Sequence, residues 1–455
     1  MPQADTKRRA ELVPVSPDAK TSDGTSVFLD ESELWDRDRI ASAQVQSLRA
    51  VLKRAAGCGF YRERLAGLDP MDIASPADIA RIPFTTKDDL RSQYPLGLLC
   101  VPRREIVRMH SSSGTTGNPV AVCHTRGDLG EWAGVMARCL YMVGVRPDDV
   151  FQNMSGYGLF TGGLGIHFGA ERLGCMTIPA GPGNSRRQIK LLRDFGTTAI
   201  HVLPSYALIL ADHMRELGED PKSFPLRVAV VGAEPYSEEF RLRLQNLYDM
   251  DVFNSYGLSE MSGPGVAFEC PWRQGLHVWE DHFLPEIVDV ATGEPVPDGE
   301  VGELVLTSLR REGMPILRYR TRDLTRFLPG DCPCGRRHRR IDRILGRADD
   351  MFIVKGVNIY PMQIERVIMT FPDVGHDYRI VLENDGLGDV LRVQIEMRDA
   401  FFEEDMRKLQ SLQKTIAQRL RSEILVTPRV ELVEGSSLPK TEGKAVRVVD
   451  MRRKD

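Results

Sequence analysis

Apolar residues recur every three to four positions near the N-terminus and predict an amphipathic helix over residues 34–56. The residues that share this face are Leu34, Ile40, Ala41, Val45, Leu48, Val51, Leu52 and Ala55. The stretch before it, residues 1–25, is polar and rich in Pro, Ser, Asp and Lys. A segment of this composition buries too little apolar surface to fold, so we expect a disordered tail there.

From about residue 120 the pattern alternates between helices and short apolar strands. Helices are predicted over residues 129–143, 187–195, 207–217 and 238–248, and strands over 198–203, 226–231 and 251–254. This alternation is typical of a mainly parallel sheet with helices on both faces. Polar, glycine-containing turns follow the strands, at the edge where open α/β sheets bind ligands.

The pattern changes after about residue 265 to antiparallel strands, predicted over residues 278–289, 302–309 and 324–327. A charged connector at residues 346–350 precedes a second mixed region, with strands at 351–354, 379–382, 391–396 and 429–433 and helices at 361–370 and 402–421. We therefore predict an α/β protein in two parts. A large N-terminal domain (26–348) has mainly parallel sheets flanked by helices plus a β-barrel-like subdomain, and a small, mobile α+β C-terminal domain covers residues 349–455.

Composition narrows the class of protein without specifying its activity. The formal net charge is −4 and 42% of the residues are hydrophobic, which is ordinary for a globular protein and gives no basic footprint for nucleic acid. No apolar run is long enough to span a bilayer, and the N-terminus lacks the apolar segment of a signal peptide. We expect a cytoplasmic protein that binds neither nucleic acid nor membrane.

Residues 111–120 read Ser-Ser-Ser-Gly-Thr-Thr-Gly-Asn-Pro-Val and form the richest hydroxyl and glycine cluster of the chain. Such a loop can surround a polyphosphate with N–H and O–H donors, and Gly114 and Gly117 permit close approach of the backbone. Asn118 stands where a P-loop has lysine, so positive charge must come from elsewhere. Taken alone, the segment is equally compatible with a flexible surface linker.

Four further segments follow the hydroxyl-rich loop in order: Tyr-Gly-Leu-Ser-Glu at 256–260, Tyr-Arg-Thr-Arg-Asp at 319–323, Gly-Arg-Ala-Asp-Asp at 346–350 and Leu-Pro-Lys-Thr-Glu-Gly-Lys at 438–444. Together they resemble the adenylate-forming superfamily of acyl-CoA ligases, luciferases and peptide-synthetase adenylation domains. Segments 157–165, 169–175, 232–235 and 279–283 are similar to the phenylacetate–CoA ligases within it. The resemblance implies ATP-dependent, Mg²⁺-dependent ligation of an aryl acid, best phenylacetate, to CoA through an acyl-adenylate. An adenylyltransferase that forms no thioester is the alternative.

The resemblance also implies roles for individual residues. Glu260 matches the Mg²⁺-binding acid, and Lys444 matches the lysine that contacts the substrate carboxylate and α-phosphate, although Lys440 is a nearby decoy. Asp323 matches the ribose-binding aspartate; considered alone, it is more typical of an ordinary ion-pair partner of Arg320 or Arg322. The phosphate loop comprises Ser112, Ser113, Gly114, Thr115, Thr116 and Gly117. The remaining nucleotide-binding residues are Gly232, Ala233, Glu234, Asn254, Ser255, Tyr256 and Arg347.

Further matches concern the hinge, the CoA side and the acid pocket. Asp349, next to Arg347, matches the family hinge, and Lys355 and Gly356 match the segment beside the thiol tunnel. The residues that would surround an aryl ring are Phe160, Gly162, Gly163 and Pro264, where glycines of a turn leave room for a flat ring. They are equally compatible with core packing. The resemblance allows a homodimer, although no segment specifies one.

Eight cysteines are scattered along the chain except for the pair Cys332 and Cys334, a pattern that favours reduced thiols. Cys270 and His277 lie upstream of this Cys-Pro-Cys-Gly turn. We predict a structural Zn²⁺ bound by Cys270, His277, Cys332 and Cys334, because three cysteines and one histidine are a recognised closed ligand set. The alternative nitrogen donors are His338 and His282, and the alternative to a metal site is a pair of reduced surface thiols.

Overall fold

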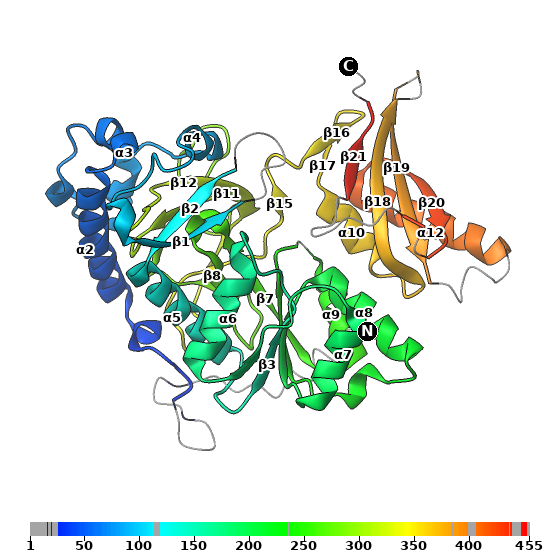
Figure 1. Ribbon diagram of the computed structural model, residues 1–455. Coiled ribbons are helices and arrows are strands. Elements are labelled where there is room, and N and C mark those ends of the chain that lie inside the picture. Colours follow the sequence, from blue (N-terminus) through cyan, green and yellow to red (C-terminus); the bar gives the residue numbers. More distant parts are fainter. Residues whose placement is uncertain are drawn as a thin grey trace. The chain divides into compact units, whose positions relative to one another are not determined.

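A nine-stranded sheet is the centre of the larger part of the computed structural model (Figure 1). Its strands in order are β13 (Phe327–Leu328), β14 (Arg340–Ile341), β9 (Leu276–Val278), β8 (Gly263–Glu269), β7 (Asp251–Leu258), β6 (Val228–Gly232), β5 (Ala199–Val202), β3 (Val150–Asn153) and β4 (Met176–Ile178). The pairs from β4 to β7 are parallel and those from β7 to β13 antiparallel. The structure describes residues 16, 20, 26–112, 119–234, 236–384, 386, 388–398, 406–435, 437–438 and 447–452.

Two compact units share these residues. The larger unit comprises Met1–Val202, Lys222–Ala233 and Asp249–Arg343, and the smaller comprises Leu203–Pro221, Glu234–Tyr248 and Ile344–Asp455. The predicted tail lies almost entirely outside the described residues. No helix in the described ranges has the length and apolar composition needed to cross a membrane.

The parallel half of the large sheet follows from its sequence. β6 reads Val-Ala-Val-Val-Gly, and all five positions are buried. A strand covered on both faces carries such a continuous apolar run, whereas a half-exposed strand alternates. The prediction of a mixed α/β fold is therefore confirmed, but the large sheet is parallel only from β4 to β7 and antiparallel from β7 to β13.

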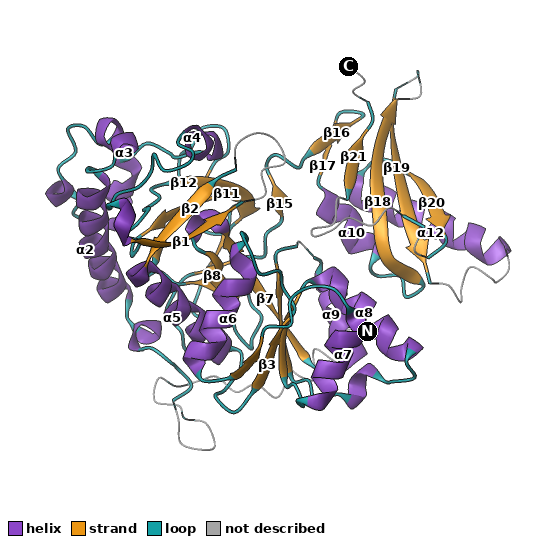
Figure 2. Ribbon diagram, in the orientation of Figure 1, coloured by secondary structure: helices purple, strands orange, loops and turns teal. Residues whose placement is uncertain are grey.

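Helices α5 (Arg126–Met142) and α6 (Thr161–Leu173) pack against each other and against β8 (Figure 2). Helix α5 starts at a capping box, in which the Asp128 amide donates to Thr125 Oγ1 (3.0 Å) and the Thr125 amide to Asp128 Oδ2 (2.8 Å). The approach of the two helices depends on glycine, because a Cβ at Gly165 would lie 2.2 Å from the Trp132 ring.

The start of α6 differs from the prediction. We expected a glycine turn around Phe160, but Gly162 and Gly163 lie in the first turn of a helix. Helix propensity disfavours this stretch, and packing against α5 outweighs the propensity.

The N-terminal segment is tied to distant parts of the larger unit by two ion pairs, one buried and one half-exposed. Its helices are α2 (Arg37–Ala55), α3 (Gly59–Arg64) and α4 (Lys87–Ser92). Just before α2, the fully buried Glu33 accepts from Arg336 Nε at 2.6 Å, and Arg37 pairs with the buried Glu280 at 2.6 Å. Residues about three hundred positions apart (|i−j| = 303 for Glu33 and Arg336) are thereby joined.

Two antiparallel assemblies complete the larger unit. A hairpin of β1 (Ile106–Ser111) and β2 (Ala121–Thr125) encloses the hydroxyl-rich loop. Strands β10 (Phe283–Val288), β11 (Gly302–Ser308) and β12 (Tyr319–Thr325) form a second sheet. The predicted strand 324–327 is misplaced, because β12 begins earlier, in the charged Tyr-Arg-Thr-Arg-Asp segment. Helix α7 (Ser185–Asp194) agrees with the prediction to within two residues.

The smaller unit contains a four-stranded sheet in the order β20 (Arg429–Val433), β19 (Asp389–Met397), β18 (Val374–Asn384) and β21 (Val448–Asp450). Its remaining elements are α8 (Pro204–Glu216), α9 (Glu238–Tyr248), β15 (Gly346–Arg347), β16 (Phe352–Val354), β17 (Val357–Ile359), α10 (Pro361–Ile368) and α12 (Met406–Ile424). Buried Glu365 on α10 accepts hydrogen bonds from the Ser237 amide (3.0 Å) and from Tyr378 Oη (2.7 Å). One carboxyl thus joins α10, β18 and the start of α9.

Candidate active site

The hydroxyl-rich loop is held at its base by the β1–β2 hairpin. The Ser112 amide donates to Val120 O (3.1 Å), and the Val120 amide donates to Ser112 Oγ (3.3 Å). The Ser111 amide donates to Leu159 O at 2.8 Å, which joins the loop to the segment before α6. The predicted phosphate-binding residues Ser113, Gly114, Thr115, Thr116 and Gly117 lie outside the described residues.

His110 reinforces the same junction from beneath the loop. Its Nδ1 lies 3.1 Å from Leu159 O. Burial lowers the pKa of His110, so the ring is neutral at pH 7 and Nδ1–H donates to the carbonyl. The base of the loop is therefore tied to residue 159 by both a main-chain and a side-chain bond.

Tyr256 and Asp323 bring two of the distant motifs together. Tyr256 Oη donates to Asp323 Oδ2 at 2.6 Å, and the Asp323 amide donates to Thr321 Oγ1 at 3.0 Å. Arg320 and Arg322 instead pair with Glu303, at 2.5 and 3.8 Å respectively. The Tyr256 hydroxyl thus orients the carboxylate for which a ribose-binding role is predicted.

Glu260 lies in η6 (Ser259–Met261), a single 3₁₀ turn after β7, with only 6% of its surface exposed. Its main-chain carbonyl accepts a hydrogen bond from Arg311 Nη1 at 2.5 Å. The carboxylate is thus carried by a short turn whose backbone is held by a buried arginine.

The predicted adenine surround occupies neighbouring strand ends. Gly232 at the end of β6 faces Ser255 of β7, and Asn254 is the preceding residue of β7. A Cβ at Gly232 would lie 2.5 Å from Ser255 O, so glycine is required there. Ala233 follows with a positive φ of 67°, a conformation that strains a non-glycine residue. The strand end thus turns sharply.

Glu234, also assigned to the adenine surround, belongs to the smaller unit. Its carboxylate accepts from Ser205 Oγ (2.8 Å) and from the Ser205 amide (3.3 Å), at the first turn of α8. These contacts fix the Glu234 side chain at the N-terminus of that helix, where a negative charge is favoured.

The predicted acid-binding residues fall into two groups. Phe160 is 56% exposed and a Cβ at Gly162 would meet no atom within 4 Å, so both lie beside open space. Gly163 and Pro264 are packed: a Cβ at Gly163 would lie 2.3 Å from Gly156 O, and Pro264 O accepts from Trp132 Nε1 at 3.1 Å. Room for a ring is therefore on the Phe160 and Gly162 side.

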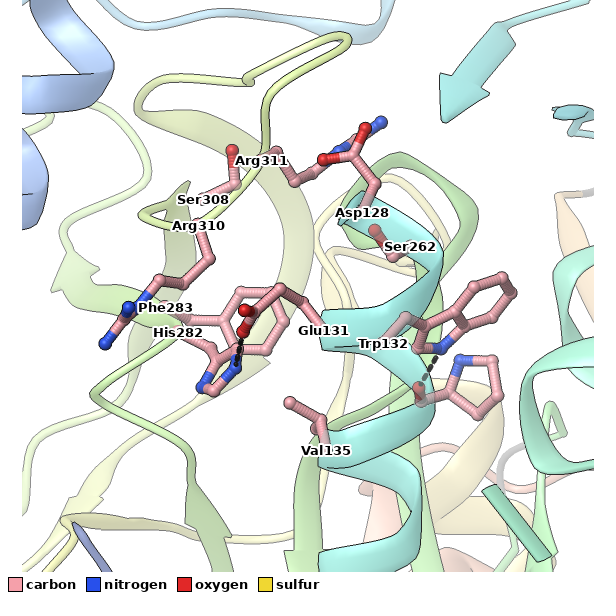
Figure 3. Close-up of a pocket in the computed structure, with 11 residues that line it drawn as sticks. Asp128, Glu131, Trp132, Val135, Ser262, His282, Phe283, Ser308, Arg310 and Arg311 are labelled. Carbon is pink, nitrogen blue, oxygen red and sulfur yellow. Dashed lines mark hydrogen bonds and ion pairs between the residues drawn. The ribbon is translucent and has the colours of Figure 1, made fainter. Parts of the chain in front are cut away.

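The pocket drawn in Figure 3 lies between α5 and the strand end at Ser308. Its volume of about 30 Å³ is room for a few waters at most, so it is too small for an aryl ring. Arg311 and Asp128 lie at one end of it, and His282 and Glu131 form an ion pair of 3.0 Å at the other. We therefore assign no substrate to it.

The predicted hinge and CoA-side residues lie in the smaller unit. Arg347 binds both carboxylate oxygens of Asp349, at 2.9 and 3.0 Å. Lys355 and Gly356 form the two-residue turn of the β16–β17 hairpin, both with positive φ (51° and 78°). A turn of this kind directs its side chains away from the strands. Lys440 and Lys444 lie outside the described residues.

Three cysteines and a histidine converge inside the larger unit. One ligand atom from each of Cys270, His277, Cys332 and Cys334 lies within 4.8 Å of all the others, and all four residues are buried. Cys270 Sγ and Cys332 Sγ are 3.6 Å apart, and Cys334 Sγ is 3.3 Å from His277 Nε2. His277 Nδ1 lies 3.2 Å from His338 O, which leaves Nε2 to face the sulfurs.

The two alternative histidines are engaged elsewhere. His338 Nδ1 accepts from the Glu280 amide at 3.1 Å. His282 pairs with Asp281 and with Glu131, each at 3.0 Å. The structure therefore groups His277, rather than His338 or His282, with the cysteines.

Sequence reasoning missed two residues that bear on the site, Arg311 and Asp128. Arg311 stands in Leu-Arg-Arg-Glu-Gly, which looks like a solvated turn, yet its side chain is buried. Asp128 had a detectable signal, since Thr-x-x-Asp before an apolar run is typical of a capping box. No comparable local signal identifies Arg311, because its contacts are with distant segments.

Two family models match the chain. Residues 90–309 match the AMP-binding enzyme model, and residues 356–452 match the AMP-binding enzyme C-terminal domain. These ranges include the hydroxyl-rich loop and Glu260 in the first, and Lys444 in the second.

Curated relatives match along almost their full length. The phenylacetate–coenzyme A ligase of Thermus thermophilus is 43% identical over 444 residues, covering 94% of this chain and 100% of the relative. That of Pseudomonas putida is 44% identical over 436 residues, covering 94% and 98%.

Among solved structures, 2-hydroxyisobutyryl-CoA ligase in the postadenylation state with R3-HIB-AMP has a TM-score of 0.89 and 29% identity, covering 96% of this chain and 95% of that one. The same ligase with 2-HIB-AMP and CoA in the thioesterification state has a TM-score of 0.70 at 30% identity, covering 96% of both. From the ordered motifs, the Tyr256–Asp323 contact and these full-length matches, we conclude that the chain belongs to the phenylacetate–coenzyme A ligase family of adenylate-forming enzymes.

Proposed function

We propose that this protein is an AMP-forming acid–thiol ligase that joins phenylacetate to coenzyme A. The observation that carries the proposal is the identity of 42–44% to four phenylacetate–coenzyme A ligases over 94% of the chain. A substrate carboxylate oxygen attacks the α-phosphorus of ATP, and pyrophosphate leaves. The CoA sulfur then attacks the acyl carbon, AMP leaves, and the thiol proton passes to solvent.

The residues of the site divide this chemistry between them. Glu260 is proposed to bind Mg²⁺, a hard cation that prefers carboxylate oxygen, and Mg²⁺ would neutralise phosphate charge when bound. Asp323, oriented by Tyr256, is proposed to accept from the ribose hydroxyls. Lys444 is proposed to stabilise charge on the α-phosphate, the compact positive charge that the hydroxyl-rich loop lacks.

The acid is proposed to lie beside Phe160 and Gly162. The exposed Phe160 ring offers a face or an edge to an aryl group, and the open space at Gly162 admits a flat ring. Tyr157, a few residues before Phe160, accepts from Asn153 Nδ2 at 2.9 Å, and burial raises its pKa to about 12. Tyr157 therefore stays neutral and adds no charge near an acid.

The experiment that tests the activity separates the two half-reactions. Purified protein is incubated with ATP, Mg²⁺ and phenylacetate, with and without CoA, and pyrophosphate, AMP and thioester are measured. CoA-dependent AMP and phenylacetyl-CoA are expected. Pyrophosphate without thioester would instead indicate an adenylyltransferase, and no turnover with phenylacetate while another aryl acid reacts would reassign the substrate.

We also propose that Cys270, His277, Cys332 and Cys334 bind a structural Zn²⁺. Zn–S bonds of about 2.3 Å and Zn–N bonds of about 2.0 Å in a tetrahedron place ligand atoms about 3.5–3.8 Å apart. The 3.6 Å separation of Cys270 Sγ and Cys332 Sγ lies in this range. The 3.3 Å separation of Cys334 Sγ and His277 Nε2 lies just below it, and all four ligand atoms lie within 4.8 Å of one another. Four protein ligands leave no open position, so the ion would link the end of β8 to residues 332–334 without entering the reaction.

Elemental analysis tests this site. About one zinc per chain is expected in the purified protein, and Cys332→Ser is expected to lose the metal and to melt at a lower temperature. Cys175→Ser, which alters a buried thiol outside the cluster, should keep both metal and stability. Metal-free protein that melts like the zinc-loaded protein would exclude a structural ion.

A further inference from the structure

Arg311 is a buried cation that contacts the main chain of Glu260. Only 5% of its surface is exposed, and its guanidinium donates to two main-chain carbonyls, Glu260 O at 2.5 Å and Cys123 O at 3.5 Å. These acceptors belong to segments far from Arg311 in sequence. Burying a guanidinium carries a large desolvation cost, which its hydrogen bonds must offset. The hydrogen bonds of Arg311 go to the backbone of η6 and β2, so its effect is expected there.

The segment that carries Arg311 is itself clamped. Asp128, at the start of α5, accepts from the amides of Glu312 (2.7 Å) and Gly313 (3.0 Å). A Cβ at Gly313 would lie 2.9 Å from Asp128 Oδ2, so only glycine allows this approach. On the far side, the Cys100 amide donates to Gly313 O at 3.0 Å. The backbone next to Arg311 is therefore held in place by hydrogen bonds with Asp128 and Cys100.

The turn that carries Glu260 has little freedom on its other side. Ser262 and Gly263 follow it with positive φ values of 74° and 95°. A Cβ at Gly263 would lie 2.4 Å from the Thr161 side chain, so the turn is in close contact with α6. With α6 on one side, the bond from Arg311 fixes the turn from the other.

The role of Arg311 depends on which oxygen of Glu260 accepts its hydrogen bond. A guanidinium bound to the carboxylate would compete with a divalent cation for the same oxygens. The bond goes instead to the main-chain carbonyl, and this leaves the carboxylate for a metal. We propose that Arg311 is a positioning residue that fixes the backbone of Glu260 and so sets the affinity of the site for Mg²⁺. The inference rests on the proposed role of Glu260.

A titration with Mg²⁺ tests this role. Pyrophosphate release in the presence of ATP and phenylacetate is followed against free Mg²⁺ for the parent protein and Arg311→Met. Loss of a charge-assisted hydrogen bond that aligns a ligand should raise the half-saturating Mg²⁺ concentration about tenfold. The rate at saturating Mg²⁺ should recover to within about twofold, because the metal then restores the alignment.

Neighbouring variants make the outcome specific. Arg310→Met removes an exposed arginine that contacts Asp281 O at 3.1 Å, and it should leave the Mg²⁺ dependence unchanged. If Arg311→Met lowers the rate equally at all Mg²⁺ concentrations, or only lowers the melting temperature, Arg311 is structural and the proposal fails. Should that variant not fold, Arg311→Lys replaces it, with an expected shift of about threefold; an unchanged half-saturation overturns the proposal.

A different result would show that Glu260 is not the Mg²⁺ ligand. Glu260→Gln should weaken the response to Mg²⁺ more than any Arg311 variant does. If Glu260→Gln responds to Mg²⁺ as the parent does, Glu260 is not the metal ligand, and the proposed function loses that assignment. If Glu260→Gln shifts the titration and Arg311→Met does not, only the role of Arg311 is wrong.

Discussion

At the scale of single residues, the contact between Tyr256 and Asp323 shows how separate motifs become one site. A phenol that donates to one carboxylate oxygen restricts the rotation of the carboxylate. Neither residue reveals this from its own position in the sequence, because they are separated by 67 positions. The flanking Arg320 and Arg322 both pair with Glu303 on the neighbouring strand.

Tyr256→Phe removes this donor while keeping the ring. We expect the KM for ATP to rise about fivefold with kcat changed less than twofold, because one hydrogen bond contributes about 1 kcal/mol and acts on nucleotide binding. Steady-state kinetics with varied ATP measure it. Tyr94→Phe, at an exposed site, is the control, and a KM like that of the parent would show that Tyr256 does not orient Asp323.

Buried carboxyls respond to pH, and Glu365 is a clear case. Burial raises its pKa above the usual value of 4.5. The folded state therefore holds the proton more tightly than the unfolded chain does, so this residue's contribution to stability is complete below pH 4.5 and is lost as pH rises through the folded pKa.

Glu365→Gln cannot ionise, so its stability relative to the parent should increase between pH 4.5 and pH 8. Thermal melts across that range measure the difference in free energy of unfolding. Glu105→Gln, at an exposed position, should show no such trend. A difference that stays constant with pH would mean that Glu365 titrates normally in the folded protein.

At the scale of elements, helix α6 contains one glycine that is tightly packed and another that faces open space. A Cβ at Gly165 would collide with Trp132 at 2.2 Å, whereas a Cβ at Gly162 would meet nothing within 4 Å. The first glycine sets the spacing of α5 and α6, and the second contributes no contact that alanine would disturb.

Gly165→Ala should therefore lower the free energy of unfolding by about 1–3 kcal/mol through overpacking. Gly162→Ala should raise it by up to about 1 kcal/mol through helix propensity. Denaturant unfolding monitored by circular dichroism compares the pair. Equal effects of the two substitutions would show that the helices adjust their spacing freely.

The same helix explains where sequence reasoning succeeded and failed. Helix α9 and strand β20 were predicted with their observed bounds, because their apolar periodicity is strong and local. Helix α6 and the first part of β12 were missed. Helix α6 is rich in glycine, and its packing against Trp132 stabilises it. The start of β12 has the sequence of a charged loop, but Glu303 on the neighbouring strand neutralises Arg320 there. Such partners lie far away in sequence.

The site was predictable to a similar degree. The motifs supplied candidate residues, and the structure places Tyr256 beside Asp323 and groups the four zinc-ligand candidates. The roles of these residues in binding ligands stay predictions. The burial of Arg311 was not predicted, because the five residues around it do not distinguish a buried arginine from a solvated one. What distinguishes it is Asp128, which arrives from another element.

At the scale of the whole molecule, the proposed reaction needs two arrangements of the site in succession. Arg347 and Asp349 are paired through two hydrogen bonds just after Gly346, whose φ is 157°. While the pair is intact, the segment is held in one backbone conformation. When the pair breaks, the segment can adopt another. We retain the proposal that Asp349 is the hinge.

Asp349→Pro should spare adenylation and lower the rate of thioester formation at least tenfold, because proline fixes its own φ and restricts the preceding residue. Pyrophosphate release and thioester formation are measured separately. Asp349→Ala removes the carboxylate without stiffening the backbone, and it should affect thioester formation less. Equal loss of both half-reactions in Asp349→Pro would place the hinge elsewhere.

The buried pair of Glu33 and Arg336 has a consequence for the life of the chain before it is complete. A ribosome adding about 5–20 residues per second needs roughly 15–60 s to pass from one partner to the other. Throughout that interval, the Glu33 carboxylate is present without the guanidinium that neutralises it, although η2 (Pro70–Asp72) and η3 (Pro76–Arg81), which pack on α2, follow soon after it. The ion pair that fixes the segment before α2 can therefore form only after about three quarters of the chain has been synthesised, so this anchor is added late in synthesis.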